Sequence, residues 1–259
     1  MGNKRNLWAK IWPPAVTLAA LLALWQAAVT WGGIDPWLLP APVSIVQEAI
    51  AVWPRLMDHT GATVRLMLIG FAGGSAAGFG LAALLHLIPW LRNVAYPLLV
   101  LSQNVPIVAI APILTMLLGW GLLPKAILVG MVCFFPITIA MLSGLENPDP
   151  QLRDYFRMIG TGKWQLFWRL ELPHAIVHLF SGLKIAASYS VLSAVVAEWL
   201  GTNKGLGAFM LISSKGFQPD RVYAAVIIIV TLSLLLFGLV ALAERLLIRW
   251  RPGSGELTK

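Results

Sequence analysis

The feature that most constrains this chain is a series of long segments without a charged side chain. Five such runs reach at least 20 residues: Ile11–Ile34, Leu66–Leu85, Asn93–Pro124, Ala126–Leu145 and Val222–Ala243. About 20 apolar residues in a helix cross the hydrocarbon of a bilayer, where every backbone group must find its partner within the segment. The runs therefore predict a chain that crosses a membrane several times as α-helices.

The composition excludes an ordinary soluble domain. Hydrophobic residues make up 58% of the 259 residues and charged residues only 12%, whereas about 25% of a soluble domain is charged. The net charge of +8 does not indicate nucleic acid, because the basic residues lie between apolar runs and form no single patch. The predicted partner for this charge is the anionic face of the lipid bilayer. A single cysteine, Cys133, excludes a disulfide framework.

A sixth span is predicted at Ala175–Ala197, although His178 and Lys184 interrupt it, because a lysine near a helix end can reach the membrane surface. The predicted fold is therefore an all-α polytopic membrane protein with six transmembrane helices. The run Asn93–Pro124 is too long for one simple span. Three prolines inside it predict that part of it is kinked or irregular: Pro97, Pro106 and Pro112. In the second run, Gly70, Gly74 and Gly78 recur every four residues and predict close packing against another helix.

The orientation is predicted from the basic residues that flank the spans, since loops rich in Lys and Arg remain in the cytoplasm. With six spans and the N-terminus inside, the cytoplasmic segments hold 13 of the 19 basic residues. Both termini are therefore expected in the cytoplasm, with the chain in a bacterial inner membrane. The first run is too long for the core of a signal peptide, which favours a retained span over a cleaved signal.

The longest cytoplasmic connection, Glu146–Pro173, predicts two short amphipathic helices. Residues 147–150 form a turn, and residues 160–162 break the helical pattern. On either side of this break, large apolar side chains recur at helical spacing: Leu152, Tyr155, Phe156 and Ile159 before it, and Trp164, Phe167, Trp168 and Leu172 after it. Such a pair either docks on a partner protein or lies on the bilayer surface.

The same segment resembles the cytoplasmic "EAA" loop of binding-protein-dependent ABC importer permeases. The resemblance lies in Asp154–Gly160, followed by Leu172, Pro173 and Ala175, although Tyr155 and Phe156 replace the family's two alanines. In that family the loop forms coupling helices that dock in a groove of the ATPase subunit. The resemblance implies these candidates for ATPase coupling: Asp154, Tyr155, Phe156, Arg157, Gly160, Leu172 and Pro173.

Further motifs are similar to the permeases of the nitrate, taurine and alkanesulfonate group. They are Leu38–Pro42, Asn104–Ile107, Phe134–Ile137, Gly182–Lys184, Ala197–Trp199 and Gly205–Gly207. Within the group, Phe180–Val191 and Asp220–Ala225 look most like permeases for hydroxymethylpyrimidine-type thiamine precursors. The resemblance implies one permease domain of the type I ABC importer architecture. Its expected parts are a first span and external connection (1–62), core spans (63–248), a coupling loop (146–175) and a tail (249–259).

The resemblance also implies partners and a cargo. The expected partners are a dimer of cytoplasmic ATP-binding subunits, an external or periplasmic substrate-binding protein, and a second permease copy, which makes a homodimer or a pair with a similar subunit. The expected cargo is a small solute such as a pyrimidine thiamine precursor, with alkanesulfonate, taurine or nitrate as alternatives. No cofactor is expected in this chain, because ATP would be hydrolysed by the partner.

A catalytic role is not indicated by the sequence. Residues 160–163 read Gly-Thr-Gly-Lys, but Trp164 stands where a phosphate-binding loop needs a hydroxyl, and Arg157 replaces its first glycine. Two alternatives from other classes remain open. A membrane enzyme would use Ser181 and Lys184, which have a Ser-x-x-Lys spacing. An ion-coupled carrier would need paired carboxylates within the spans, and the sequence offers none. The four histidines do not predict a metal site.

Polar residues within apolar spans are the candidates for a translocation path, because they are costly in lipid. The candidate residues are Ser102, Gln103 and Asn104 before Pro106, then Ser188 and Ser190 with Ser193 in the predicted span Ala175–Ala197, and Glu198 at its end. Hydrogen bonding between helices explains the serines and amides equally well. Glu198 would alternatively be an external helix-end residue or part of a local ion pair.

Overall fold

A computed structural model describes residues 3–201 and 203–248, and every regular element in these ranges is helical. The prediction of an all-α protein is confirmed. The elements are α1 (Asn3–Trp31), α2 (Pro42–Ala51), α3 (Trp53–Leu87), α4 (Pro89–Ser102), α5 (Ile107–Leu118), α6 (Leu122–Glu146), α7 (Pro150–Met158), α8 (Lys163–Leu166), the π-helical turn η1 (Phe167–Glu171), α9 (Leu172–Glu198), α10 (Leu206–Lys215) and α11 (Pro219–Leu247).

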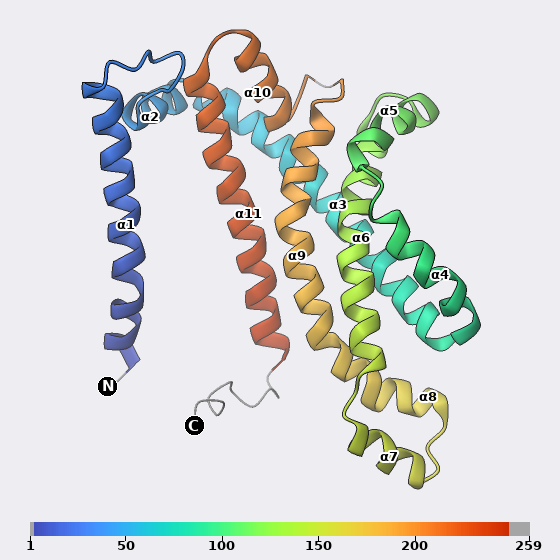
Figure 1. Cartoon of the computed structure of the whole chain (residues 1–259). Coiled ribbons are helices and arrows are strands. Elements are labelled where there is room, and N and C mark those ends of the chain that lie inside the picture. Colours follow the sequence, from blue (N-terminus) through green and yellow to red (C-terminus); the bar gives the residue numbers. More distant parts are fainter. Residues whose placement is uncertain (1–2, 202, 249–259) are drawn as a thin grey trace.

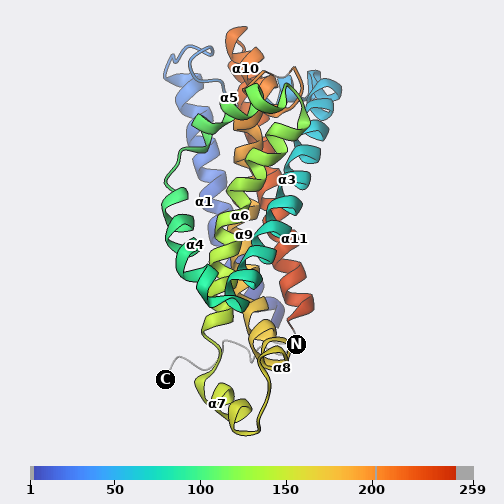
Figure 2. The same cartoon turned by 90° about the vertical axis from the view of Figure 1, so that its right-hand side faces the viewer.

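The long helices run between two distinct ends of the molecule (Figure 1). The short helices α2, α5 and α10 gather at one end, which we call the α10 end, and α7 and α8 protrude from the other, the α7 end. The chain enters α1 and leaves α11 at the α7 end (Figures 1 and 2). The termini of this bundle therefore lie on the same side as the predicted coupling loop.

Within the described ranges, five helices are long and apolar enough to cross a membrane. They cover Trp12–Trp31 of α1, Trp53–Leu87 (α3), Leu122–Glu146 (α6), Lys163–Glu198 (α8, η1 and α9, which are continuous) and Pro219–Leu247 (α11). Four of the five uncharged runs and the predicted sixth span at Ala175–Ala197 thus fall on long helices. The exposed sides of these helices are apolar, as on α1 and α11, which suits a lipid environment.

The predicted span Asn93–Pro124 does not form one helix, so the count of six long spans is not matched. Its residues divide between α4 and α5, which are separated at Gln103–Pro106. Pro106 lacks a backbone N–H and disfavours the helical conformation at Val105, which explains the break. At 1.5 Å per residue, these helices are only about 20 Å long, and a bilayer core of about 30 Å exceeds either one.

The centre of the bundle is the contact of α6 with α3 and α9. Gly70 and Gly74 of α3 lie directly against Val129 and Gly130, and a Cβ at Gly78 would lie 2.9 Å from the backbone oxygen of Phe134. On the other side of α6, a Cβ at Gly182 of α9 would lie 2.8 Å from the backbone oxygen of Pro136. The glycine spacing therefore marks close helix contact, as predicted.

Candidate coupling surface and translocation face

The coupling loop forms a helical hairpin that stands clear of the long helices (Figure 2). Asp149 caps α7 by accepting a hydrogen bond from the backbone N–H of Gln151 at 2.9 Å, and Pro150 begins the helix. Gly160 ends it with φ +75°, a conformation that favours glycine, and its N–H donates to Arg157 O at 3.0 Å. Asp149 and Gly160 therefore fix where the hairpin starts and turns.

The outer surface of this hairpin is apolar and exposed. Met158 is 79% exposed and Trp164 is 61% exposed, and Tyr155, Ile159 and Trp168 are also exposed. Stacked or edge-on aromatic contacts connect Trp164 with Phe167 and Trp168 at ring-centroid distances of 6.0 Å. An exposed apolar patch outside the long helices is typical of a protein–protein interaction site. We call this patch the hairpin face.

The seven residues predicted for coupling lie in two places. Asp154, Tyr155, Arg157 and Gly160 are exposed on the hairpin, and Phe156 is half-buried on it. Leu172 and Pro173 are half-buried at the first turn of α9, where proline begins a helix without losing a hydrogen bond. The structure thus places five of the seven on the hairpin, whereas Leu172 and Pro173 connect it to the bundle.

The three polar residues before Pro106 lie together at the break between α4 and α5. The Ser102 hydroxyl donates to Leu99 O at 2.8 Å, and the Asn104 amide donates to Val100 O at 3.2 Å, so both satisfy the last carbonyl groups of α4. Gln103 and Asn104 are exposed. In a membrane, irregular backbone is tolerated only where protein buries it or where it faces a water-filled cavity.

The serines of α9 do not share one surface. Ser188 is exposed, whereas Ser190 is buried and its hydroxyl donates to Ala187 O at 2.8 Å. Next to Ser188, the exposed Tyr189 lines a groove of about 180 Å³ together with Ser193. We call it the α9 groove. The other residues that line it come from α5, α6, α9 and the turn after α9: Ala111, Leu128, Val132, Leu192, Val196, Ala197 and Leu200.

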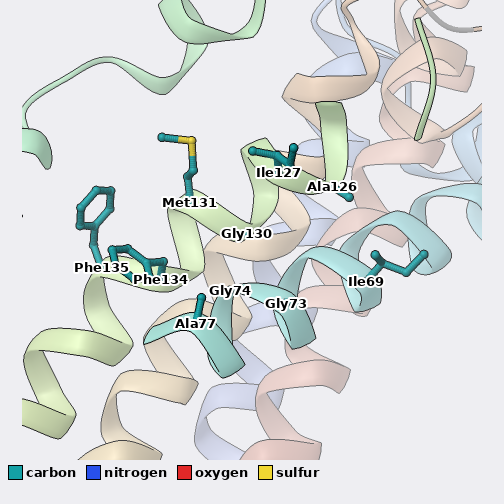
Figure 3. Close-up of a pocket in the computed structure, with 10 residues that line it drawn as sticks. All are labelled: Ile69, Gly73, Gly74, Ala77, Ala126, Ile127, Gly130, Met131, Phe134 and Phe135. Carbon is teal, nitrogen blue, oxygen red and sulfur yellow. The ribbon is translucent and has the colours of Figure 1, made fainter. Parts of the chain in front are cut away.

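A second cavity, of about 470 Å³, lies between α3 and α6 (Figure 3). Ten residues line it, and none of these ten carries a polar side chain. The backbone at Gly73, Gly74 and Gly130 forms one wall of the cavity, and the side chains of Met131 and Phe135 lie beside it. This cavity offers no side-chain hydrogen bond or charge to a polar solute, so its chemistry suits acyl chains or another helix.

Glu198 lies inside the α10 end and is only 2% exposed. One carboxylate oxygen accepts from the Thr63 hydroxyl at 2.8 Å, and the other accepts from the Gly207 backbone N–H at 2.8 Å. Thr63 in turn accepts from the N–H of Leu206 at 2.8 Å. The nearby Lys125, itself buried, interacts electrostatically with the carboxylate. Glu198 and Thr63 thus connect the first turn of α10 to α9 and α3.

The residues of the alternative enzyme site do not form catalytic machinery. Lys184 Nζ lies 2.7 Å from Glu244 Oε2, so this ammonium is engaged in an ion pair between α9 and α11. An amine held as a paired cation is not available as a base for Ser181. The described residues contain no group of three or more His, Cys, Asp or Glu that could hold a metal ion.

Sequence reasoning missed Tyr189 as a candidate, because an aromatic residue within an apolar run is expected to pack in the core or against lipid. The available signal was the spacing of Tyr189, Ser193 and Val196, which places them on one side of α9.

The bundle of long apolar helices, the broken helix pair and the protruding hairpin define a multi-pass membrane transport subunit. Residues 74–249 match the model of the binding-protein-dependent transport system inner membrane component family. The chain therefore belongs to this family and is the permease subunit of an ABC importer, an integral membrane protein whose relatives are non-catalytic transporter components. Membership implies an ATP-binding subunit and a substrate-binding protein as partners.

Known relatives support this assignment over most of their length. The formylaminopyrimidine transport permease protein ThiX of Halalkalibacterium halodurans is 34% identical over 92% of this chain and 95% of its own. The riboflavin transport system permease protein RibX of Chloroflexus aurantiacus is 32% identical over 95% and 94%. Permeases for aliphatic sulfonates from Bacillus subtilis, taurine from Escherichia coli and nitrate from Synechocystis also match. The predicted membership of the nitrate, taurine and sulfonate group is confirmed.

A solved structure supports the fold independently of sequence. The crystal structure of an amino acid ABC transporter with histidines has a chain that superposes with a TM-score of 0.64 at 15% identity, covering 77% of this chain and 97% of that one. At this identity the likeness concerns the fold alone.

Proposed function

We propose that this permease carries a small solute across the bacterial inner membrane and couples the movement to ATP hydrolysed by a separate dimeric subunit. The hairpin face is the observation that supports ATPase coupling, because its aromatic and apolar side chains are exposed and α7 lies beyond the ends of the long helices (Figure 2). ATP-driven closure of the docked partners would pull two such hairpins together and switch the side from which the path is open. This chain needs no cofactor for that role.

The proposed coupling role also determines which end of the bundle faces the cytoplasm, because the ATP-binding subunit is cytoplasmic. The α7 end faces the cytoplasm, so that both termini are cytoplasmic, and the α10 end receives the external binding protein. The supporting observation is that the chain enters α1 and leaves α11 at the α7 end, where the sequence also concentrates its basic residues.

The translocation path lies along the α9 groove and the break between α4 and α5 in our proposal, with a second permease copy, identical or similar, completing it. Ser102, Gln103 and Asn104 interrupt an apolar run, and Gln103 and Asn104 expose polar groups. Discontinuous helices of this kind mark substrate sites in other transporters. Ser188 and Tyr189 contribute from α9, whereas Ser190 and Glu198 are buried and contribute by holding helices in place.

A pyrimidine thiamine precursor is the proposed cargo. A relative that is 34% identical to this chain is named for formylaminopyrimidine transport. The α9 groove presents one aromatic ring and one hydroxyl, Tyr189 and Ser193, and its nine lining residues include no Lys or Arg. This lining suits a flat neutral heterocycle better than alkanesulfonate, taurine or nitrate, whose charge a cation would recognise.

Reconstitution tests the proposal directly. The chain is co-expressed with the ATP-binding subunit and purified, and uptake of labelled hydroxymethylpyrimidine, taurine and nitrate into proteoliposomes is measured with the binding protein and MgATP. We expect co-purification of the ATP-binding subunit and uptake of the pyrimidine alone. Failure to co-purify would contradict the coupling role and favour an ion-driven carrier or a membrane enzyme, and uptake of an anion instead would replace the cargo assignment.

A further inference from the structure

Glu171 is a buried carboxylate that the family assignment does not explain. It lies in η1, immediately before α9, and is 4% exposed. Arg153 of α7 donates from Nη2 to one of its oxygens at 3.0 Å, and His86 of α3 lies with Nε2 2.7 Å from the other. Because a carboxylate only accepts hydrogen bonds, Nε2 of His86 carries the hydrogen. A charge buried to this extent is costly unless such partners satisfy it.

The three groups come from different parts of the molecule. His86 is in the last turn of α3, which packs along the centre of the bundle, whereas Arg153 is in the coupling hairpin. Glu171 stands between them, on the turn that leads into α9. One side chain thus connects the hairpin, α3 and the start of α9.

The hairpin has little other support in the single chain. Every residue of α7 remains at least partly exposed, and Arg153 is more covered than its neighbours along the helix. The turn at Gly160 folds the hairpin on itself but does not fix its angle to the bundle. The Arg153–Glu171 ion pair is the polar contact that holds α7 toward the long helices.

The π-helical turn explains how Glu171 reaches this position. Within η1, Phe167, Leu170 and Glu171 are buried while Trp168 and Arg169 are exposed. A π-turn adds one residue to a helical turn and so rotates the residues that follow, and such turns occur frequently at functional sites. The ring of His86 lies 6.0 Å from the Phe167 ring, so the same turn also packs against the end of α3.

We propose that Glu171 is a positioning residue that makes α7 and the end of α3 move as one body when the ATP-binding subunits close. The inference rests on the proposed coupling function and deepens it by naming the joint. A carboxylate with one oxygen on each partner transmits displacement of the hairpin to α3, and a neutral side chain cannot hold both partners equally well.

Spin labels test the rigidity of this joint, and uptake of the proposed pyrimidine is measured beside them. Labels are attached to cysteines at Gln151 of α7 and Leu87 of α3, both exposed, in the full complex with its ATP-binding subunits. In the wild type we expect one narrow distance distribution in the nucleotide-free state and the same distribution after trapping with MgATP and vanadate. In Glu171→Gln and Arg153→Gln the distribution broadens in both states, and ATP-driven uptake falls about tenfold while the partner stays bound.

Matched variants separate positioning from general stability. Arg153→Gln lies on the exposed hairpin, so it tests the joint even if Glu171→Gln does not fold. Glu244→Gln removes a comparable ion pair, that with Lys184 at 2.7 Å, and should leave the α7–α3 distance unchanged. Arg153→Lys keeps the charge and should restore most of the uptake.

The outcomes distinguish this inference from the coupling proposal. If the ATP-binding subunit does not bind the wild-type chain, the proposed function fails. If it binds, and Arg153→Gln retains the narrow distribution and wild-type uptake, the inference about Glu171 alone is overturned. A broad distribution in the bound wild-type complex would also overturn it.

Discussion

The two ends of α9 each carry a buried glutamate, and the groups around them differ. Glu198, at the α10 end, accepts hydrogen bonds from a hydroxyl and a backbone N–H, both fixed by the fold, and the buried Lys125 lies near it. Glu171, at the α7 end, is held by an arginine and a histidine on long side chains from two other helices. The same residue type with the same burial therefore serves two purposes. At the α10 end the glutamate holds segments within the bundle together, whereas at the α7 end it joins the protruding hairpin to the bundle.

Gly205→Ala should produce the largest effect, because it damages the α10 end. A Cβ there would collide with the carboxylate of Glu198, and φ is +111°, where residues with a Cβ are strained. We expect a loss of about 3 kcal/mol or more in stability, measured as thermal unfolding in detergent. Gly80→Ala, in α3 with no atom within 4 Å of the added Cβ, is the control and should be neutral or slightly stabilising. Equal melting temperatures for both variants would contradict the rigid description of this end.

Glu198→Gln should cost about 1–3 kcal/mol, less than the glycine substitution. The amide of glutamine can accept from only one of Thr63 and the Gly207 N–H, so one buried donor loses its acceptor. Asp58→Asn is the control, since Asp58 is 63% exposed and its ion pair with Lys204 is long, at 3.7 Å. The two unfolding curves are compared under identical detergent conditions. Superimposable curves would show that Glu198 does not hold the α10 end.

Gly160→Val should separate transport from stability at the α7 end. The backbone strain at φ +75° is about 1–2 kcal/mol and falls on an exposed turn, so the bundle should remain folded. The turn itself should change conformation and alter the orientation of α7. We expect uptake to be lost with little change in membrane insertion or melting temperature. Gly162→Ala, at an ordinary φ of −67°, should transport normally. Normal uptake by the valine variant would remove the coupling assignment.

Tyr189→Phe and Tyr189→Ala should give the smallest effect, because neither end of α9 is touched. Phenylalanine keeps a ring for stacking on a flat heterocycle, so we expect uptake of hydroxymethylpyrimidine to change less than about twofold, whereas alanine should lower it about fivefold to tenfold. Initial uptake rates over a range of concentrations provide the measurement. If the two variants behave alike, the ring has no part in the path.

The long helices could be predicted from sequence because an uncharged run of about 20 residues, the minimum that crosses a bilayer, is visible in the sequence. The break at Gln103–Pro106 could be anticipated only in part, since an apolar run has the same hydropathy whether it forms one helix or two. The inward direction of Glu198 could not be predicted, because its partners Thr63 and Gly207 belong to segments that only the tertiary fold brings together. For the same reason the sequence did not single out Glu171, whose partners lie 18 and 85 positions away.

The hairpin was easier to predict, because its signals are local. The cap at Asp149, the turn at Gly160 and the apolar spacing around them all lie within one segment. The angle between the hairpin and the bundle was not predictable, since it depends on the ion pair between Arg153 and Glu171 and on the π-helical turn that orients Glu171.

The isolation of α1 has a consequence for how this protein is made. Only 6% of its apolar segment Trp12–Trp31 is buried within the chain, so this helix gains little stabilisation from the other described spans. Its own partition into lipid must keep it in the bilayer while translation of the remaining helices continues. A charged substitution near its centre should therefore act during biosynthesis, by lowering the yield of inserted chains.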